Sequence, residues 1–93
     1  MQVKHHNTGD DGIFYIDEEG KRLADMRYMV VNGNQMDIYH TEVEPAFEGS
    51  GLGKKLIDAG VNYAREKHYK VIPSCTFAKT VFAQNQDYKD VLA

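Results

Sequence analysis

The sequence predicts a mixed α/β fold, in which an antiparallel β-meander is followed by an α-β-α segment. Two observations carry this prediction. The first half alternates β-branched and aromatic residues with polar ones, while the second half changes to the helical spacing of three and four residues. A helix between two strands of one sheet makes those strands parallel, through a right-handed crossover. At 93 residues the chain has the size of a single domain, residues 1–93.

Three strands are expected in the first half, over residues 12–17, 23–31 and 36–43. A polar turn at Glu18-Glu19-Gly20-Lys21 separates the first two strands. Asn32-Gly33-Asn34 supplies the positive-φ residues of a hairpin between the second and third. Alternation in the second strand puts one set of side chains on the same side: Ala24, Met26, Tyr28 and Val30.

Two helices are expected in the second half, over residues 51–68 and 74–84. Between them, residues 69–72 read as a short strand that is stopped by Pro73. Apolar residues of the first helix share one face: Leu52, Leu56, Ile57, Gly60, Tyr63 and Ala64. The pattern does not decide whether residues 87–92 form a helical turn or a strand.

Composition excludes several classes of protein. An apolar fraction of 42% and a charged fraction of 27% are ordinary for a soluble domain. No apolar run approaches the roughly 18–20 residues of a membrane span, and the N-terminus lacks an apolar signal segment. The single cysteine cannot form an internal disulfide. We therefore expect a cytoplasmic monomer or weak dimer that does not act at membranes.

Charge is unevenly distributed along the chain. The net charge of −3 argues against a general nucleic-acid binder. Residues 1–48 carry four Lys/Arg and ten Asp/Glu, whereas residues 49–93 carry seven Lys/Arg and four Asp/Glu. A small anionic ligand would thus find its counter-charges in the second half. The alternative is that these lysines only lie on the wet face of a helix.

A glycine-rich loop joins the third strand to the long helix. Gly49, Gly51 and Gly53 lack the Cβ atoms that would hinder a phosphate, and Lys54 and Lys55 follow at once. Unpaired backbone N–H groups at a helix start carry about half a positive charge, which attracts anions. The loop has neither the Gly-Lys-Ser/Thr ending of a P-loop nor the spacing of a dinucleotide-binding turn. Glycines placed only for tight turning remain the alternative.

The stretch V-E-P-A-F-E-G-S-G-L-G-K-K-L, from Val43 to Leu56, resembles the acetyl-CoA-binding motif of the GNAT acetyltransferase superfamily. Residues 40–92 resemble a small branch of it, the YjdJ-like proteins. Three segments carry this resemblance: His40-Thr41-Glu42-Val43, Glu48-Gly49-Ser50-Gly51 and Pro73-Ser74-Cys75-Thr76-Phe77. Asn85-Gln86 depart from the His-Pro that many members have before the final tyrosine.

The resemblance implies a GNAT-like mixed sheet that binds acetyl-CoA and transfers the acetyl group to an amine of a small molecule or protein. The pantetheine arm would lie along residues 38–43. Implied contacts to the coenzyme come from Thr41, Val43, Gly49, Ser50, Gly51, Leu52, Gly53, Lys54 and Lys55. Glu48 stands where most members have Gln or Arg, and a carboxylate beside a pyrophosphate is unfavourable. We expect no phosphate contact from Glu48.

Acyl transfer to an amine needs a base, donors for the thioester carbonyl and an acid for the thiolate. His40 and Glu42 share one face of a strand, and either can serve as the base. The alternative is that His40 is a hydrogen-bonded sheet residue and Glu42 is solvated. Cys75 follows a strand at an expected helix N-terminus, where the dipole favours a nucleophilic thiolate with His40 as its base. It can equally line the pocket or be a core residue. Tyr88 is a candidate acid or a packing residue.

Three alternatives for function follow from these residues. The first is an acetyltransferase, and the second is a coenzyme A-binding module without significant catalysis. The third is an unrelated α/β interaction domain in which the loop only turns the chain. No metal is expected, because His5-His6 lack metal-site spacing with other ligands; His40, Glu42 and Cys75 are the one set that could in principle hold a metal. The sequence does not identify the acceptor.

Overall fold

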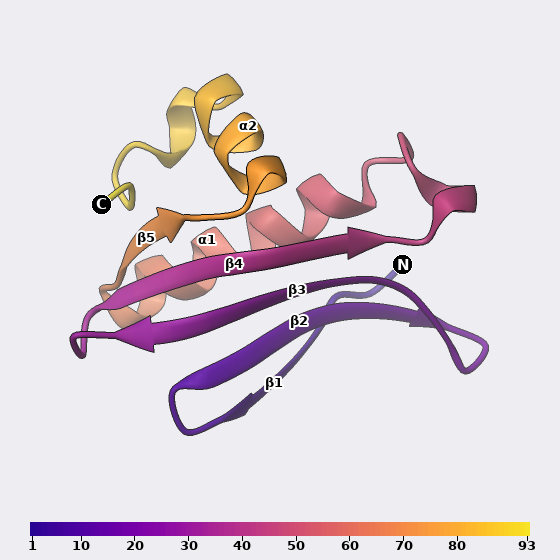
Figure 1. Ribbon diagram of the computed structural model, residues 1–93, viewed down its shortest axis with the longest axis horizontal. Coiled ribbons are helices and arrows are strands. Elements are labelled where there is room, and N and C mark those ends of the chain that lie inside the picture. The colour runs from indigo at the N-terminus through magenta and orange to yellow at the C-terminus, as the bar shows by residue number, and fades with distance from the viewer.

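The computed structural model describes residues 1–93 as a five-stranded sheet with two helices (Figure 1). The elements follow in the order β1 (Lys4–Thr8), β2 (Asp11–Glu18), β3 (Lys21–Val31), β4 (Gln35–Val43), a short 3₁₀ turn η1 (Pro45–Phe47), α1 (Leu52–Lys67), β5 (Lys70–Pro73), α2 (Thr76–Gln84) and a second 3₁₀ turn η2 (Gln86–Tyr88). Strands lie in chain order across the sheet. The first four are antiparallel, and β5 is parallel to β4, so the predicted fold class is confirmed.

The core lies between one face of the sheet and α1. Alternate residues of β3 and β4 point into it, and Met26, Met36 and Ile38 are fully buried. Gly60 of α1 leaves room for the side chain of Met26, which a Cβ at that position would contact at 2.6 Å. Figure 1 shows α1 crossing behind the strands, while no helix covers the opposite face of β2, β3 and β4. We call this opposite side the open face.

Strand β1 is a feature that the sequence did not predict. Its residues, KHHNT, are exposed and show no apolar alternation. The strand forms because its backbone pairs with β2 and because the His5 ring stacks on Phe14 at 4.0 Å. His5 Nε2 also lies 2.6 Å from the hydroxyl of buried Tyr28. These are long-range contacts, which a local pattern does not reveal.

The C-terminal segment packs back onto the sheet. Leu92 forms an isolated parallel bridge with Val71 of β5, and Tyr88 and Val91 join the core. Arg65 of α1 holds this segment through Asp90, with N–O distances of 2.8 and 2.9 Å. The tail thus has both a helical turn and a strand-like contact. None of the helices combines the length and apolar character that crossing a membrane requires.

Candidate functional site

A groove of about 750 Å³ opens between the end of β4, the glycine loop, the start of α1 and one side of α2. Its lining includes most of the residues expected to bind a coenzyme: Thr41, Val43, Gly49, Gly51, Leu52, Gly53 and Lys54. Three further polar side chains line it: Glu48, Gln84 and Asn85. Phe47, Phe77 and Val81 supply apolar surface.

The groove exists because β4 and β5 diverge. Their pairing ends at Ile38 and Pro73, and the N–H groups of Ser74 and Cys75 both donate to the Ile38 carbonyl, at 2.9 and 3.1 Å. Beyond this point the chain turns into α2, so β5 no longer borders β4. Residues 39–43 of β4 therefore have a sheet neighbour only on the β3 side. An extended ligand can occupy the other edge.

Backbone donors gather at the start of α1. Gly49 and Gly51 have φ of 80° and 90°, and neither would bring a Cβ within 4 Å of another group. The first helical bond runs from the Lys55 N–H to the Gly51 carbonyl, and no side chain caps the helix. The N–H groups of residues 52–54 thus remain without a helical acceptor. This combination suits an anion such as a phosphate.

Gly53 has a different role from the other two glycines. It is buried in the first turn of α1, and a Cβ there would lie 2.5 Å from Cζ of Phe77. The small residue allows α2 to approach α1 closely, so its first function is packing. The prediction that all three glycines serve phosphate access thus needs a correction, because at Gly53 the space is already filled by Phe77.

Of the two lysines predicted to contact the coenzyme, only Lys54 lines the groove. Its ammonium lies 3.2 Å from both carboxylate oxygens of Asp58 and 3.5 Å from the Tyr88 hydroxyl. The hydrogen bond with Asp58, followed by that with Tyr88, raises the pKa of Lys54. Lys55 instead donates to the Met1 carbonyl, and the Ser50 hydroxyl donates to the Phe47 carbonyl. Neither Lys55 nor Ser50 lines the groove.

Cys75 caps the N-terminus of α2 as expected. Its Sγ accepts a hydrogen bond from the Ala78 N–H at 3.4 Å and lies 3.4 Å from the hydroxyl oxygen of Thr41. Since Thr41 lines the groove, the Cys75 thiol lies at the edge of the groove, near the point where β4 and β5 stop pairing. The partner that sequence reasoning missed is Thr41, which it assigned only to the coenzyme.

His40 lies on the other face of β4 from Cys75. The register of β4 with β3 shifts by one residue, because Arg27 pairs with His40 while Tyr28 pairs with Ile38. The extra residue, Tyr39, reverses the alternation, so that His40 faces away from the core and Thr41 faces the groove. The structure therefore does not support His40 as the base for Cys75.

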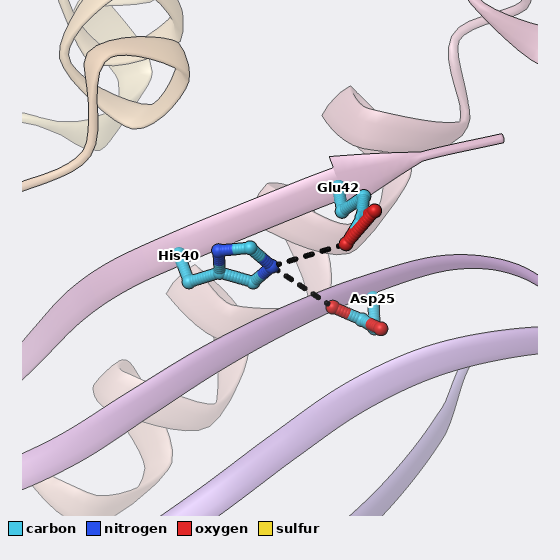
Figure 2. A group of neighbouring side chains, drawn as sticks. All are labelled: Asp25, His40 and Glu42. Carbon is cyan, nitrogen blue, oxygen red and sulfur yellow. Dashed lines mark ion pairs between the residues drawn. The ribbon is translucent and has the colours of Figure 1, made fainter. Parts of the chain in front are cut away.

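His40 and Glu42 do share a face, as predicted, and Asp25 of β3 joins them on the open face (Figure 2). The Nε2 atom of His40 lies 3.5 Å from Glu42 Oε1 and 3.7 Å from Asp25 Oδ1. These three groups are close enough to hold one divalent cation, with ligand atoms within 4.8 Å of one another. Arg22 and Arg27 already pair with Asp25, at 3.6 and 3.9 Å, and would compete with a cation. We therefore interpret the group as an ion-pair network.

Tyr88 is buried and does not line the groove. Its hydroxyl donates to Asp58, and burial followed by this hydrogen bond raises its pKa. Its ring also packs on Phe82, with centroids 5.0 Å apart. A raised pKa makes a weaker acid, so these contacts favour the packing role over that of a proton donor to the thiolate.

Sequence reasoning missed Asp25 and the part of α2 that lines the groove. Asp25 could have been singled out from the sequence, because it is the one acidic residue within the mainly apolar strand segment LADMRYMVV. Phe77 and Val81 belong to the apolar side of α2. Val81 is buried in the core and Phe77 is 38% exposed, and both line the groove.

The fold and the groove define an α/β protein in which a helix N-terminus meets an unpaired strand edge. The family model described as GCN5-related N-acetyl-transferase matches residues 13–91, and the chain belongs to this family. Protein NATD1 of Xenopus tropicalis is 31% identical over 62 residues, which span 67% of this chain and 57% of that protein.

Solved structures share the fold. A GCN5-like candidate N-acetyltransferase from Staphylococcus aureus, determined by NMR, is 39% identical with a TM-score of 0.77, over 99% of this chain and 87% of its own. An aminoglycoside N-acetyltransferase in complex with CoA is 15% identical with a TM-score of 0.66, over 89% of this chain and 88% of its own. The latter likeness concerns the fold alone.

Proposed function

We propose that this protein binds acetyl-CoA in the groove and transfers its acetyl group to an amine. The single observation that carries the proposal is the groove itself, which joins the unpaired edge of β4 to the backbone donors at the start of α1. The pyrophosphate would lie on the N–H groups of residues 52–54, with Lys54 as the nearest cation. The pantetheine arm would extend along Thr41 and Val43 toward Cys75.

Transfer proceeds by attack of the amine nitrogen on the thioester carbonyl carbon, with loss of the coenzyme A thiolate. Unpaired backbone N–H groups on the β4 edge are donors for the carbonyl oxygen as its charge develops. A base for the amine proton is available on the open face, where His40 and Glu42 lie. The amine would therefore approach from the face opposite the groove.

A titration of the ¹⁵N-labelled protein with coenzyme A tests the binding step. We expect amide shifts in Gly49, in residues 51–54 and in Thr41 and Val43. Residues of β1, at the far edge of the sheet, should keep their shifts and serve as the internal control. Unchanged spectra at saturating coenzyme would contradict the proposal and would favour an interaction domain with no coenzyme.

The second candidate function is a coenzyme A-binding module without significant catalysis. It is favoured by the open face, where no helix covers the group of His40 and Glu42 to form an acceptor pocket. Release of free thiol from acetyl-CoA, measured across a panel of amines, separates the two functions. Binding without amine-dependent release would favour the module.

A covalent route through Cys75 remains part of this proposal. The thiolate would take the acetyl group from the coenzyme and pass it to the amine. Intact-mass measurement after incubation with acetyl-CoA should then show one added acetyl group, absent in Cys75→Ala. Direct transfer predicts no adduct and a Cys75→Ala variant that still turns over. Thr41→Val is the matched variant that keeps the thiol but removes its hydroxyl partner.

We further propose that the protein belongs to the YjdJ-like branch and is cytoplasmic. We also propose that residues 1–93 form a single domain and that the protein is a monomer or a weak dimer. Size-exclusion chromatography with light scattering would test the last of these.

A further inference from the structure

We infer that Asp25 is a positioning residue for His40, which it holds with the ring proton on Nε2, so that Nδ1 is free to take a proton from the acceptor amine. This inference rests on the proposed acetyl transfer. It adds a residue on β3, and it assigns the two nitrogens of the imidazole to different tasks.

The burial of Asp25 is the first observation. Asp25 is the one charged residue in the buried class, at 9% exposed, and its Oδ1 is buried without a hydrogen-bond partner. A buried carboxylate oxygen without a donor is costly, and native proteins rarely leave one so. The ring nitrogen Nε2 of His40 lies 3.7 Å away. A movement of about 0.7 Å would bring the pair into hydrogen-bond range.

The two oxygens of Asp25 have different neighbours. Oδ2 lies 3.6 Å from the Arg22 guanidinium, whereas Oδ1 faces His40 at 3.7 Å and Arg27 Nε at 3.9 Å. The arginines come from the same strand, β3, and Glu42 comes from β4. The Arg22 guanidinium lies on the Oδ2 side of Asp25, while Oδ1, the oxygen nearest the imidazole, has no hydrogen-bond partner and remains available as an acceptor.

The surroundings of the ring select its tautomer. Nε2 of His40 faces two carboxylates, Asp25 Oδ1 and Glu42 Oε1, as Figure 2 shows. Only a protonated nitrogen interacts favourably with both acceptors, so the neutral ring carries its proton on Nε2. Nδ1 then has the lone pair. In Figure 2 it lies on the opposite side of the ring from the carboxylates.

The place of His40 along β4 connects it to the reaction. It is two residues beyond Ile38, where β4 and β5 diverge, and it is followed by Thr41, which lines the groove on the opposite face. An amine that arrives on the open face would thus meet the thioester across this strand edge. As its nitrogen bonds to the carbonyl carbon, one amine proton passes to Nδ1. The C–S bond breaks, the thiolate takes a proton from water, and the imidazolium returns its proton to the hydroxide that remains.

The imidazolium formed in this step carries N–H groups on both nitrogens. Its Nε2–H still points at the carboxylates of Asp25 and Glu42, so the ring keeps its orientation through the step. Glu42 is 70% exposed at its side chain and is therefore screened by water, whereas the side chain of Asp25 is only 12% exposed. We thus assign the larger part of the positioning to Asp25.

The tautomer can be read directly by long-range ¹H–¹⁵N NMR of the histidine rings, without coenzyme or acceptor. We expect His40 to be the Nε2–H tautomer in the native protein and a mixture of both tautomers in Asp25→Asn. Asp17→Asn is the matched control, since Asp17 pairs with Arg22 at 2.7 Å and has no contact with His40. A native His40 with its proton on Nδ1 would overturn the inference, whatever the variants do.

Kinetics give the second readout. Once an accepted amine is known, Asp25→Asn should lower kcat roughly tenfold, a part of the 10²–10⁴ that a general base supplies, and leave the KM for acetyl-CoA unchanged. Asp17→Asn should keep native kcat. If the Asp25→Asn variant had the native kcat, Asp25 would not position His40 for catalysis and its role would be only structural. If no amine is acetylated, the proposed function fails, and the NMR result still decides the tautomer.

Discussion

Replacing Gly53 by alanine tests how the glycine loop is joined to the rest of the site. The new Cβ would lie 2.5 Å from Cζ and 2.8 Å from Cε2 of Phe77, whereas carbon atoms normally approach to about 3.5 Å. The ring must therefore retreat by about 1 Å. Overpacking of this kind costs about 1–3 kcal/mol, and because Phe77 is 38% exposed it can swing outward at a cost of about 1–2 kcal/mol.

The substitution also has a favourable part. Alanine in a helix is more stable than glycine by roughly 0.5–1 kcal/mol. We thus expect Gly53→Ala to lower the free energy of unfolding by about 0.5–1 kcal/mol in the native background. In a Phe77→Ala background the clash with the ring is gone and only the higher helix propensity of alanine remains. Gly53→Ala should then raise the free energy of unfolding by roughly 0.5–1 kcal/mol. The sign of the effect reverses.

Urea unfolding followed by far-UV circular dichroism measures all four proteins of this cycle, since the chain has no tryptophan. The coupling between the two positions should be about 1–2 kcal/mol. Gly51→Ala is the control: its φ of 90° makes alanine unfavourable by about 1 kcal/mol, but no atom lies within 4 Å, so Phe77 should not matter. An equal loss for Gly53→Ala in both backgrounds would refute the packing argument.

Two further predictions concern the coenzyme and pH. Lys54→Ala should weaken coenzyme A binding several-fold by calorimetry, while Lys55→Ala should change it little, because only Lys54 lines the groove; equal effects would contradict this assignment. Stacking on Phe14 buries the face of the His5 ring and lowers its pKa from 6.5. Its contribution to stability is therefore complete above pH 6.5 and falls as the pH drops toward the folded pKa. The midpoint urea concentration of unfolding should fall less between about pH 7 and pH 5 in His5→Gln than in the native protein. An equal fall in both proteins would show that His5 is not the cause of this pH dependence.

Much of this protein follows from local pattern. Alternation predicted the strands β2, β3 and β4, and the change to helical spacing predicted α1 and α2, because each pattern reflects which side of an element meets the core. The positive φ of Asn32 and Gly33 follows from their residue types. Strand β1 had no such pattern. Its pairing with β2 and the contacts of His5 with Phe14 and Tyr28 are made across the sheet.

The sequence by itself determined the glycine loop and the helix start that follows it, because a strand, closely spaced glycines and an amphipathic helix in succession place backbone donors there. The groove also needs the divergence of β4 and β5 and the approach of α2, which are tertiary features. The tertiary structure decided on which face each neighbouring residue lies. Counted from Met36 and Ile38, strict alternation would put His40 toward the core, yet the extra residue Tyr39 turns it to the open face beside Asp25. That bulge arises from the register between β3 and β4, which side chains from both strands select together.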